Sequence, residues 1–107
     1  MIVAFHATAW DEYHHWAATD RQMIKRINVL ISECQRHPFE GIGRPESLRQ
    51  NMKGWWSRRI DREHRLVYRI VGSGNGQTLE IIQCRYHYYA ASASPAATAL
   101  AHAHWKL

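Results

Sequence analysis

Long apolar runs, cysteines and acidic residues are all scarce in this sequence of 107 residues. No apolar run approaches the roughly 20 residues of a transmembrane helix, and the N-terminus, MIVAFHATAW, lacks the basic start and long apolar stretch of a signal peptide. The two cysteines, Cys34 and Cys84, do not have the spacing of metal ligands. These absences argue against a membrane protein or a disulfide-stabilised secreted domain, and they predict a cytoplasmic protein with two ordinary buried thiols.

Acidic residues are outnumbered by basic residues, nine to 14, which gives a formal net charge of +5 at pH 7. The basic residues gather between Arg44 and Arg69, where eight of them stand against three acidic residues. Arginine offers a rigid fork of donors that matches phosphate oxygens. This stretch therefore predicts a surface that faces a polyanion. The alternative is a solvated sheet face whose charges serve solubility.

The first part of the chain has the pattern of one short strand and two helices. Residues 2–5, IVAF, are typical of a strand. Capping signals at Thr8 and Thr19 predict one helix from about Ala9 and a second that follows at once, and Pro38 ends the second. The result is a pair of antiparallel helices joined by a tight turn. The second helix has one apolar face at helical spacing, formed by Met23, Ile27, Leu30, Ile31 and Cys34.

The remainder of the domain has the alternation of β-strands. Residues 38–54 are irregular, with one possible short strand near Leu48. Alternating patterns then appear in residues 55–60, 64–71 and 79–88, and GSGNG, residues 72–76, connects the last two as a hairpin. The order of elements predicts an α+β fold, in which an antiparallel sheet carries the two N-terminal helices on one face.

The predicted last strand leads into a segment of different composition. Hydrophobic residues make up 46% of the chain, which suits a single folded domain over residues 1–88. Residues 89–107 are rich in alanine and serine, and they predict a disordered extension or a short helix from about Ala96. Alternation along the last strand would place its final side chains on two faces, with Arg85 and His87 on one and Cys84, Tyr86 and Tyr88 on the other.

The basic stretch contains a carboxylate with the properties of a general base. Cleavage of RNA without a metal ion needs a base for the ribose 2′-hydroxyl, cations for the charge on the phosphorane, and an acid for the leaving oxygen. Glu46 lies among Arg44, Arg49 and Lys53, whose charges favour its ionised form. The alternative for Glu46 is a surface carboxylate paired with a neighbouring arginine.

Three further residues fit the other roles. Arg65 lies in a predicted strand between apolar neighbours, where an isolated charge needs an anion; the alternative is an ion pair with Glu63 or Glu80. His87 has an ordinary imidazole pKa near 6.5, so it can donate a proton near neutrality; the alternative is a structural histidine at a strand end. Tyr88 offers a ring on which a base can stack.

These residues stand in motifs that resemble a known family. PFEGIGRPESLRQNMKGWWSRRIDREHRLVYRI followed by CRYHY resembles the YoeB-type toxins of the RelE superfamily, and WDEYHHWAATDRQMIKRINVLI is similar to their helical half. The resemblance covers residues 1–88. It implies a microbial-RNase-like α+β fold and a bacterial, cytoplasmic, ribosome-dependent mRNA interferase. Such an endoribonuclease needs no cofactor or metal, cleaves the message in the ribosomal A site and stops translation.

The resemblance also implies partners. A toxin of this kind belongs to a type II toxin–antitoxin pair and is neutralised by a YefM-like antitoxin. Its other partners are a second copy of itself in a homodimer and the 70S ribosome with its mRNA. Operator DNA is contacted only through the complex with the antitoxin, and no membrane is involved.

Four residues match the catalytic residues of the family. Glu46 in RPES matches the general base, and Arg65 in HRLVY matches the arginine that stabilises the phosphate. His87 in CRYHY matches the general acid, and Tyr88 matches the tyrosine that orients the phosphate or a base.

Other positions match less closely. Arg59 in WSRRI matches a phosphate contact, whereas Arg49 stands where the family usually has lysine, which keeps the charge and changes the geometry. The hairpin VGSGNGQT is longer than usual, and loop tips tolerate such insertions. The family usually ends at the tyrosine that matches Tyr88, and we expect residues 89–107 to hang away from the site.

Two other functions are compatible with the same fold. ParE-type relatives inhibit gyrase, but they lack the set of glutamate, arginine and histidine that this chain has. A second alternative is a non-catalytic module that binds RNA or operator DNA, with the C-terminal extension covering the site.

Overall fold

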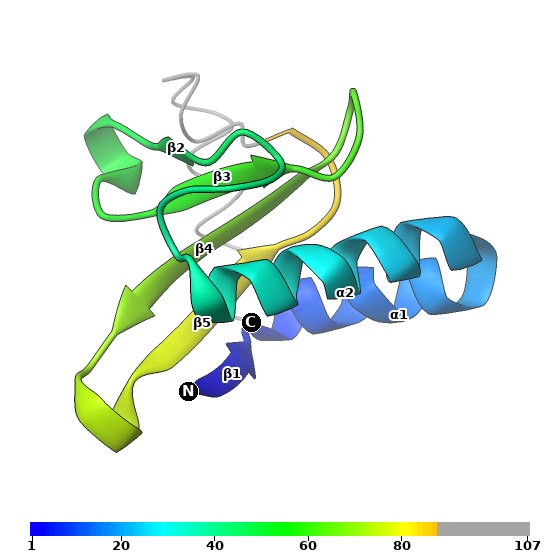
Figure 1. Ribbon diagram of the computed structural model, residues 1–107. Helices are drawn as coiled ribbons and strands as arrows, with labels where there is room; N and C mark the ends of the chain where they lie inside the picture. The colour runs from blue at the N-terminus through cyan, green and yellow to red at the C-terminus, as the bar shows by residue number, and fades with distance from the viewer. Residues whose placement is uncertain (88–107) are drawn as a thin grey trace.

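The computed structural model describes residues 1–87 (Figure 1). The predictions for Tyr88 and for residues 89–107, including the domain boundary at residue 88, lie outside the described residues and stay predictions. No helix within residues 1–87 is both long and apolar enough to cross a lipid bilayer. Both cysteines are free and buried, as predicted.

Two antiparallel helices, α1 (Ala7–Thr19) and α2 (Arg21–Arg36), lie side by side, as the sequence predicted (Figure 1). The predicted capping residues were wrong, because Thr8 and Thr19 both lie inside α1. The cap of α2 is Asp20, whose carboxylate accepts hydrogen bonds from the backbone N–H groups two and three residues further on. The single residue between the helices therefore both ends α1 and starts α2.

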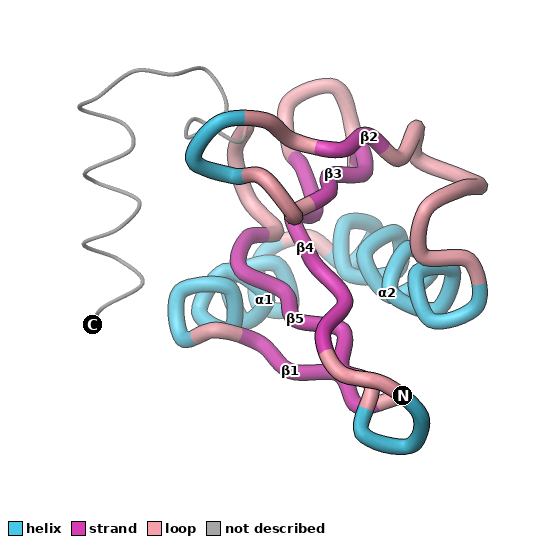
Figure 2. The backbone as a smooth tube through the Cα atoms, turned by 90° about the vertical axis from the view of Figure 1, so that its left-hand side faces the viewer, coloured by secondary structure: helices cyan, strands magenta, loops and turns pink. Residues whose placement is uncertain are grey.

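Five strands form one sheet in the order β1-β5-β4-β3-β2, which Figure 2 shows from bottom to top. The strands are β1 (Ile2–Phe5), β2 (Glu46–Ser47), β3 (Trp56–Arg59), β4 (Arg65–Val71) and β5 (Thr78–Gln83). The α+β class is confirmed. The sheet is mixed rather than purely antiparallel, because β1 pairs with β5 in parallel. Because β2, β3, β4 and β5 alternate in direction, β2 runs opposite to β1, and the two helices bring the chain back to the end of the sheet at which β1 finishes.

The sheet separates two apolar clusters. The larger cluster joins buried residues of both helices to one face of the sheet and includes Ile27, Leu30, Leu66, Tyr68 and Ile81. The smaller cluster lies on the other face and consists of Leu48, Met52, Trp55, Val67 and Ile82. The alternation predicted for residues 55–60 is confirmed, since Trp56 and Ile60 belong to the helix side and Trp55 to the other side.

The last strand is shorter than the sequence predicted. β5 ends at Gln83, and residues 84–86 bend away, with Tyr86 in the left-handed region at φ 68°. The amide nitrogen of the Gln83 side chain donates to the carbonyls of Arg85, Tyr86 and His87, at 2.9, 3.0 and 2.8 Å. Strand alternation therefore stops at Gln83, and the predicted division of the last side chains between two faces was wrong for residues 84–87.

The loop between α2 and β2 is held by the guanidinium of Arg58, a side chain with no exposed surface. Arg58 donates to the hydroxyl of Tyr68 at 3.1 Å, which in turn donates to the carbonyl of Pro38 at 2.6 Å. Its other N–H groups donate to the backbone carbonyls of His37, Glu40 and Ile42. Carbonyl dipoles thus replace the water that the buried charge has lost.

We expect Arg58→Met to destabilise the protein by about 3 kcal/mol or more, because it leaves buried carbonyls and a hydroxyl without their donor. Thermal denaturation should show the midpoint falling by roughly 10 °C or more. The matched control is Arg62→Met at an exposed position of the turn after β3, which should change stability by less than about 0.5 kcal/mol. Equal effects of the two substitutions would contradict the role given to Arg58.

Candidate active site

The strand register places three of the predicted site residues on the same face of the sheet. Across β2, β3 and β4 the paired residues are Glu46 with Ser57, Ser57 with Val67, and Arg59 with Arg65. Side chains of directly paired residues project from the same face. Since Val67 belongs to the cluster on the side away from the helices, Glu46, Arg59 and Arg65 project from that side too.

Arg65 is a buried cation held by backbone oxygens. Only 7% of its surface is exposed. Its Nη1 donates to three carbonyls of the turn between β3 and β4, those of Asp61, Arg62 and His64, at 2.9, 3.3 and 3.1 Å. These bonds fix the direction of the guanidinium before any ligand arrives, which is the condition for electrostatic stabilisation without reorganisation.

The alternative given for Arg65, an ion pair on the sheet, was wrong for residues 1–87. Glu63 instead approaches His64, with 3.4 Å between Oε1 and Nε2. Glu80 instead pairs with Arg69. The charge of Arg65 is thus not neutralised by either of the two carboxylates that the sequence offered.

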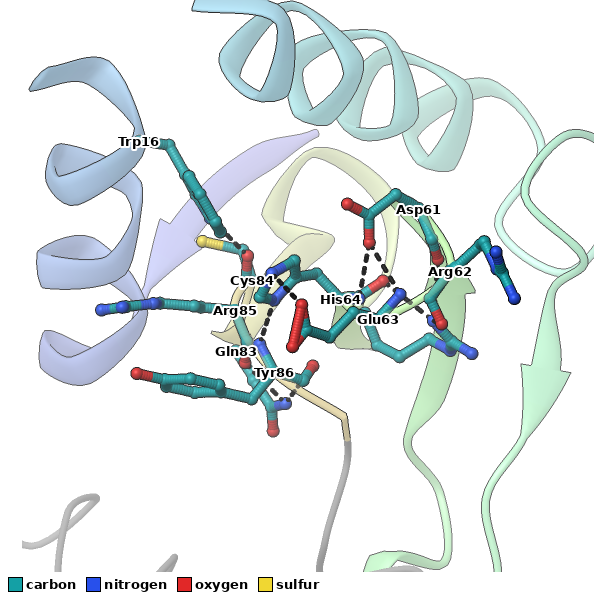
Figure 3. A network of polar contacts seen from close by, with 10 residues as sticks. Trp16, Asp61, Arg62, Glu63, His64, Gln83, Cys84, Arg85 and Tyr86 are labelled. Atoms are coloured by element: carbon teal, nitrogen blue, oxygen red, sulfur yellow. Dashed lines mark hydrogen bonds and ion pairs between the residues drawn. The ribbon is translucent and has the colours of Figure 1, made fainter. Parts of the chain in front are cut away.

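The turn after β5 is fastened to β4 by its backbone (Figure 3). The N–H of Tyr86 donates to Nδ1 of His64 at 2.7 Å, and the N–H of Arg65 donates to the carbonyl of Tyr86 at 3.0 Å. Because Nδ1 of His64 accepts, the proton of the neutral ring lies on Nε2. Together with the bond from Gln83 to the carbonyl of His87, these contacts set the backbone of His87 beside the first residue of β4.

The imidazole of His87 lies within the electrostatic reach of the other site residues. Partial burial lowers the pKa of His87 below its ordinary value, and the positive charges of Arg65 and, more weakly, Arg59 act in the same direction. The negative charge of Glu46 acts in the opposite direction and raises it. Charges from three other segments of the chain therefore act on this imidazole, which is mostly neutral at pH 7 in the free protein because its pKa is lowered.

The other two predicted site residues are not placed in this group. Arg49 is exposed at the N-cap of the short 3-10 helix η1 (Gln50–Met52), and its charge is not among those that act on His87. Tyr88 lies outside the described residues. Glu46 is exposed and forms no ion pair with any residue from 1 to 87, so its alternative as a carboxylate paired with a neighbouring arginine is not supported there.

Sequence reasoning missed the residues that hold the turn carrying His87. Glu12 of α1 accepts a hydrogen bond from the N–H of Cys84 at 2.8 Å, and Trp16 donates to the carbonyl of Cys84 at 2.9 Å (Figure 3 shows the bond from Trp16). Gln83 supplies the three bonds described above. A signal existed for Glu12, because it lies one helical turn from the apolar Trp16, where an ionisable side chain is unusual.

The arrangement combines a carboxylate, a fixed guanidinium and a titratable imidazole. These are the groups that proton transfer at a phosphodiester needs. No three or more His, Cys, Asp or Glu side chains within residues 1–87 lie together in a way that would hold a metal ion. The expectation of a reaction without metal or cofactor stays a prediction.

Comparison with known proteins identifies a family over nearly the whole domain. A family model described as the YoeB-like toxin of the bacterial type II toxin-antitoxin system matches residues 5–88. Toxin YoeB of Escherichia coli (strain K12) is 50% identical over 88 residues, which cover 82% of this chain and all of that protein.

Solved structures agree with the sequence comparison. A YoeB/ParE toxin from Agrobacterium tumefaciens is 51% identical with a TM-score of 0.81, and the match covers 82% of this chain and all of that one. Two structures from Staphylococcus aureus, a heterotetrameric YoeB-YefM complex and a YoeB dimer, are each 38% identical, with TM-scores of 0.73 and 0.72. Each match covers 82% of this chain and 98% of the chain compared.

We expect the pKa of His87 in the free protein to lie below about 6.5, and Glu46→Gln to lower it further, because the substitution removes a negative charge that raises it. Titration of the imidazole followed by NMR measures both values. Glu40→Gln, at an exposed carboxylate outside this group of charges, is the control and should leave the pKa of His87 unchanged. An unchanged pKa in Glu46→Gln would mean that the two side chains do not face each other.

Proposed function

Because the chain belongs to the YoeB-like toxin family of bacterial type II toxin–antitoxin systems, we propose that it is a ribosome-dependent mRNA interferase. It enters the ribosomal A site, cleaves the bound message and stops translation. The observation that carries the proposal is the action of the charges of Arg65, Glu46 and Arg59 on the imidazole of His87. These are the residues that a general acid/base cleavage of RNA requires, and the sheet register sets three of them on one face.

In the proposed reaction, Glu46 accepts the proton of a ribose 2′-hydroxyl. The 2′-oxygen then forms a bond to the adjacent phosphorus, and the bond from phosphorus to the 5′-oxygen breaks. His87, in its protonated form, gives its proton to that leaving oxygen. The products are a 2′,3′-cyclic phosphate and a free 5′-hydroxyl. General acid and base groups of this kind each contribute about 10²- to 10⁴-fold.

Arg65 stabilises the charge that develops on the phosphorane. Its bonds to three carbonyls support this role, because a guanidinium already fixed in direction needs no reorganisation during the reaction. Arg59, its exposed partner across the two strands, contacts the phosphate from the solvent side. Arg49 contacts the RNA further from the cleaved bond, and Tyr88 orients the phosphate or a neighbouring base.

The lowered pKa of His87 fits an acid that becomes charged only when substrate is bound. In the free protein the neighbouring arginines oppose protonation of the ring. A bound phosphate brings a negative charge that offsets both arginines and favours the imidazolium. The cleavage rate should then fall as the pH rises through the pKa of His87 in the complex, because the acid loses its proton.

The relatives supply the proposed partners. The structures from Staphylococcus aureus are a YoeB-YefM complex and a YoeB dimer. By analogy, this chain is neutralised by a YefM-like antitoxin and forms a homodimer. The 70S ribosome and its message complete the set, and operator DNA is reached only through the antitoxin complex.

Glu46→Gln and His87→Ala should each reduce cleavage of a translated message by about 10²-fold or more while ribosome binding stays close to that of the parent. Primer extension in a cell-free translation reaction locates the cuts, and sedimentation with ribosomes measures binding. The double substitution His37→Ala with Glu40→Gln, at an exposed pair of the loop before β2, is the control and should cleave normally.

Three results would contradict the proposal. Full cleavage by His87→Ala would mean that the acid is assigned wrongly. Breaks in DNA that depend on gyrase, with the message intact, would favour a ParE-type toxin. Binding of RNA by the parent protein without any cut would favour a non-catalytic module.

Ending the chain after Tyr88 should preserve or raise cleavage, because no proposed catalytic group lies in residues 89–107 and we expect this extension to hang away from the site. The same primer-extension assay measures it, with the full chain as the reference. A large loss of cleavage in the shortened protein would show that the extension is part of the site.

A further inference from the structure

Helix α1 holds the end of β5 through both backbone polar groups of Cys84. Oε1 of Glu12 accepts from its N–H at 2.8 Å, and Nε1 of Trp16 donates to its carbonyl at 2.9 Å. Glu12 and Trp16 are four residues apart, so both project from the same face of the helix. The sulfur of Cys84 lies 3.5 Å from the carbonyl oxygen of Ala9. The N–H, the carbonyl and the thiol of Cys84 therefore all contact helix α1.

Cys84 is the point at which the chain leaves the sheet. The next residues, Arg85, Tyr86 and His87, are not part of a strand, and their backbone is held by hydrogen bonds to side chains and to the backbone of β4. The carbonyls of these three residues are held by Gln83 and by β4, as described above. The start of the segment is held by the contacts of Cys84. The backbone that carries His87 is thus held at both ends, by the contacts of Cys84 and by those of Gln83 and β4.

Glu12 is a carboxyl in a partly buried position. Burial raises its pKa to about 7, against the opposing effects of the Cys84 N–H and of the charge of Arg85; the charge of Asp11, on its own helix, raises it further. A carboxyl in either form keeps an oxygen that accepts from the N–H of Cys84. The contact therefore persists across the neutral range, and an amide can replace the carboxyl without loss of the acceptor.

We propose that Glu12 is a positioning residue for His87: by accepting from the N–H of Cys84, it fixes the turn of residues 84–87 and so the place of the imidazole beside Arg65. This role rests on the proposed function, in which His87 is the general acid. Glu12 touches neither the substrate nor the reacting atoms. A displacement of a reacting group by about 1 Å is enough to lower a rate by about 10²-fold.

The test compares variants with and without an acceptor at position 12. Glu12→Met keeps the length of the side chain and removes the acceptor, Glu12→Gln keeps both, and Asp11→Asn changes an exposed neighbour on the same helix. Message cleavage on ribosomes should fall about 10- to 100-fold in Glu12→Met, with ribosome binding unchanged. It should stay within about threefold of the parent in the other two variants.

The second readout does not depend on cleavage. In Glu12→Met the pKa of His87, followed by NMR, should move back toward its ordinary value, because the ring is no longer held beside Arg65. In Glu12→Gln it should keep the parent value. A general loss of stability would not shift this pKa in a protein that remains folded. If Glu12→Met does not fold, Glu12→Ala, a smaller side chain without an acceptor, gives the same comparison.

The outcomes separate the two proposals. If the parent protein cuts no message, the proposed function fails, and the pKa of His87 still decides the role of Glu12. If the parent cuts and a folded variant without the acceptor cuts equally well with an unchanged pKa of His87, the positioning role is wrong. Loss of cleavage in Glu12→Gln equal to that in Glu12→Met would also overturn it, because the acceptor would then not be the cause.

Discussion

The guanidinium of Arg58, enclosed between the sheet and α2, connects parts of the chain that share no strand pairing. Its donors reach the carbonyls of His37, Glu40 and Ile42 and the hydroxyl of Tyr68. The loop that follows α2 is thereby drawn onto β3, where the backbone of the next residue, Arg59, donates to the carbonyl of Gly43. β2 begins at Glu46, three residues after Gly43. A buried cation on the helix side of the sheet therefore sets the course of the segment that carries the Glu46 carboxylate on the other side.

The candidate site combines rigid and accessible parts. Arg65 and the backbone around His87 are held by several hydrogen bonds each, and the former is buried. Glu46 belongs to a two-residue strand at the edge of the sheet and is exposed. The guanidinium of Arg65 and the backbone that carries His87 are thus held in place, whereas the carboxylate of Glu46 lies where a large polyanion has access to it.

The sequence predicted what depends on periodicity and missed what depends on single side chains. Alternation in residues 55–60 placed Trp55 and Trp56 correctly on opposite faces, because a strand can turn its side chains only two ways. It did not predict the end of β5, since the bend there comes from the Gln83 side chain and the left-handed backbone of Tyr86. The cap of α2 was misplaced by one residue, because Thr19 and Asp20 both have capping side chains and only geometry chooses between them.

One consequence of the topology concerns the order in which the chain is made. The first strand, β1, finds its partner in the last strand, β5, and the pair runs in parallel. During synthesis, β1 has no strand to pair with until almost the entire domain has been made. The segment that carries His87 is made after β5. A growing chain that has not yet reached β5 therefore lacks both the strand that pairs with β1 and the segment that carries His87.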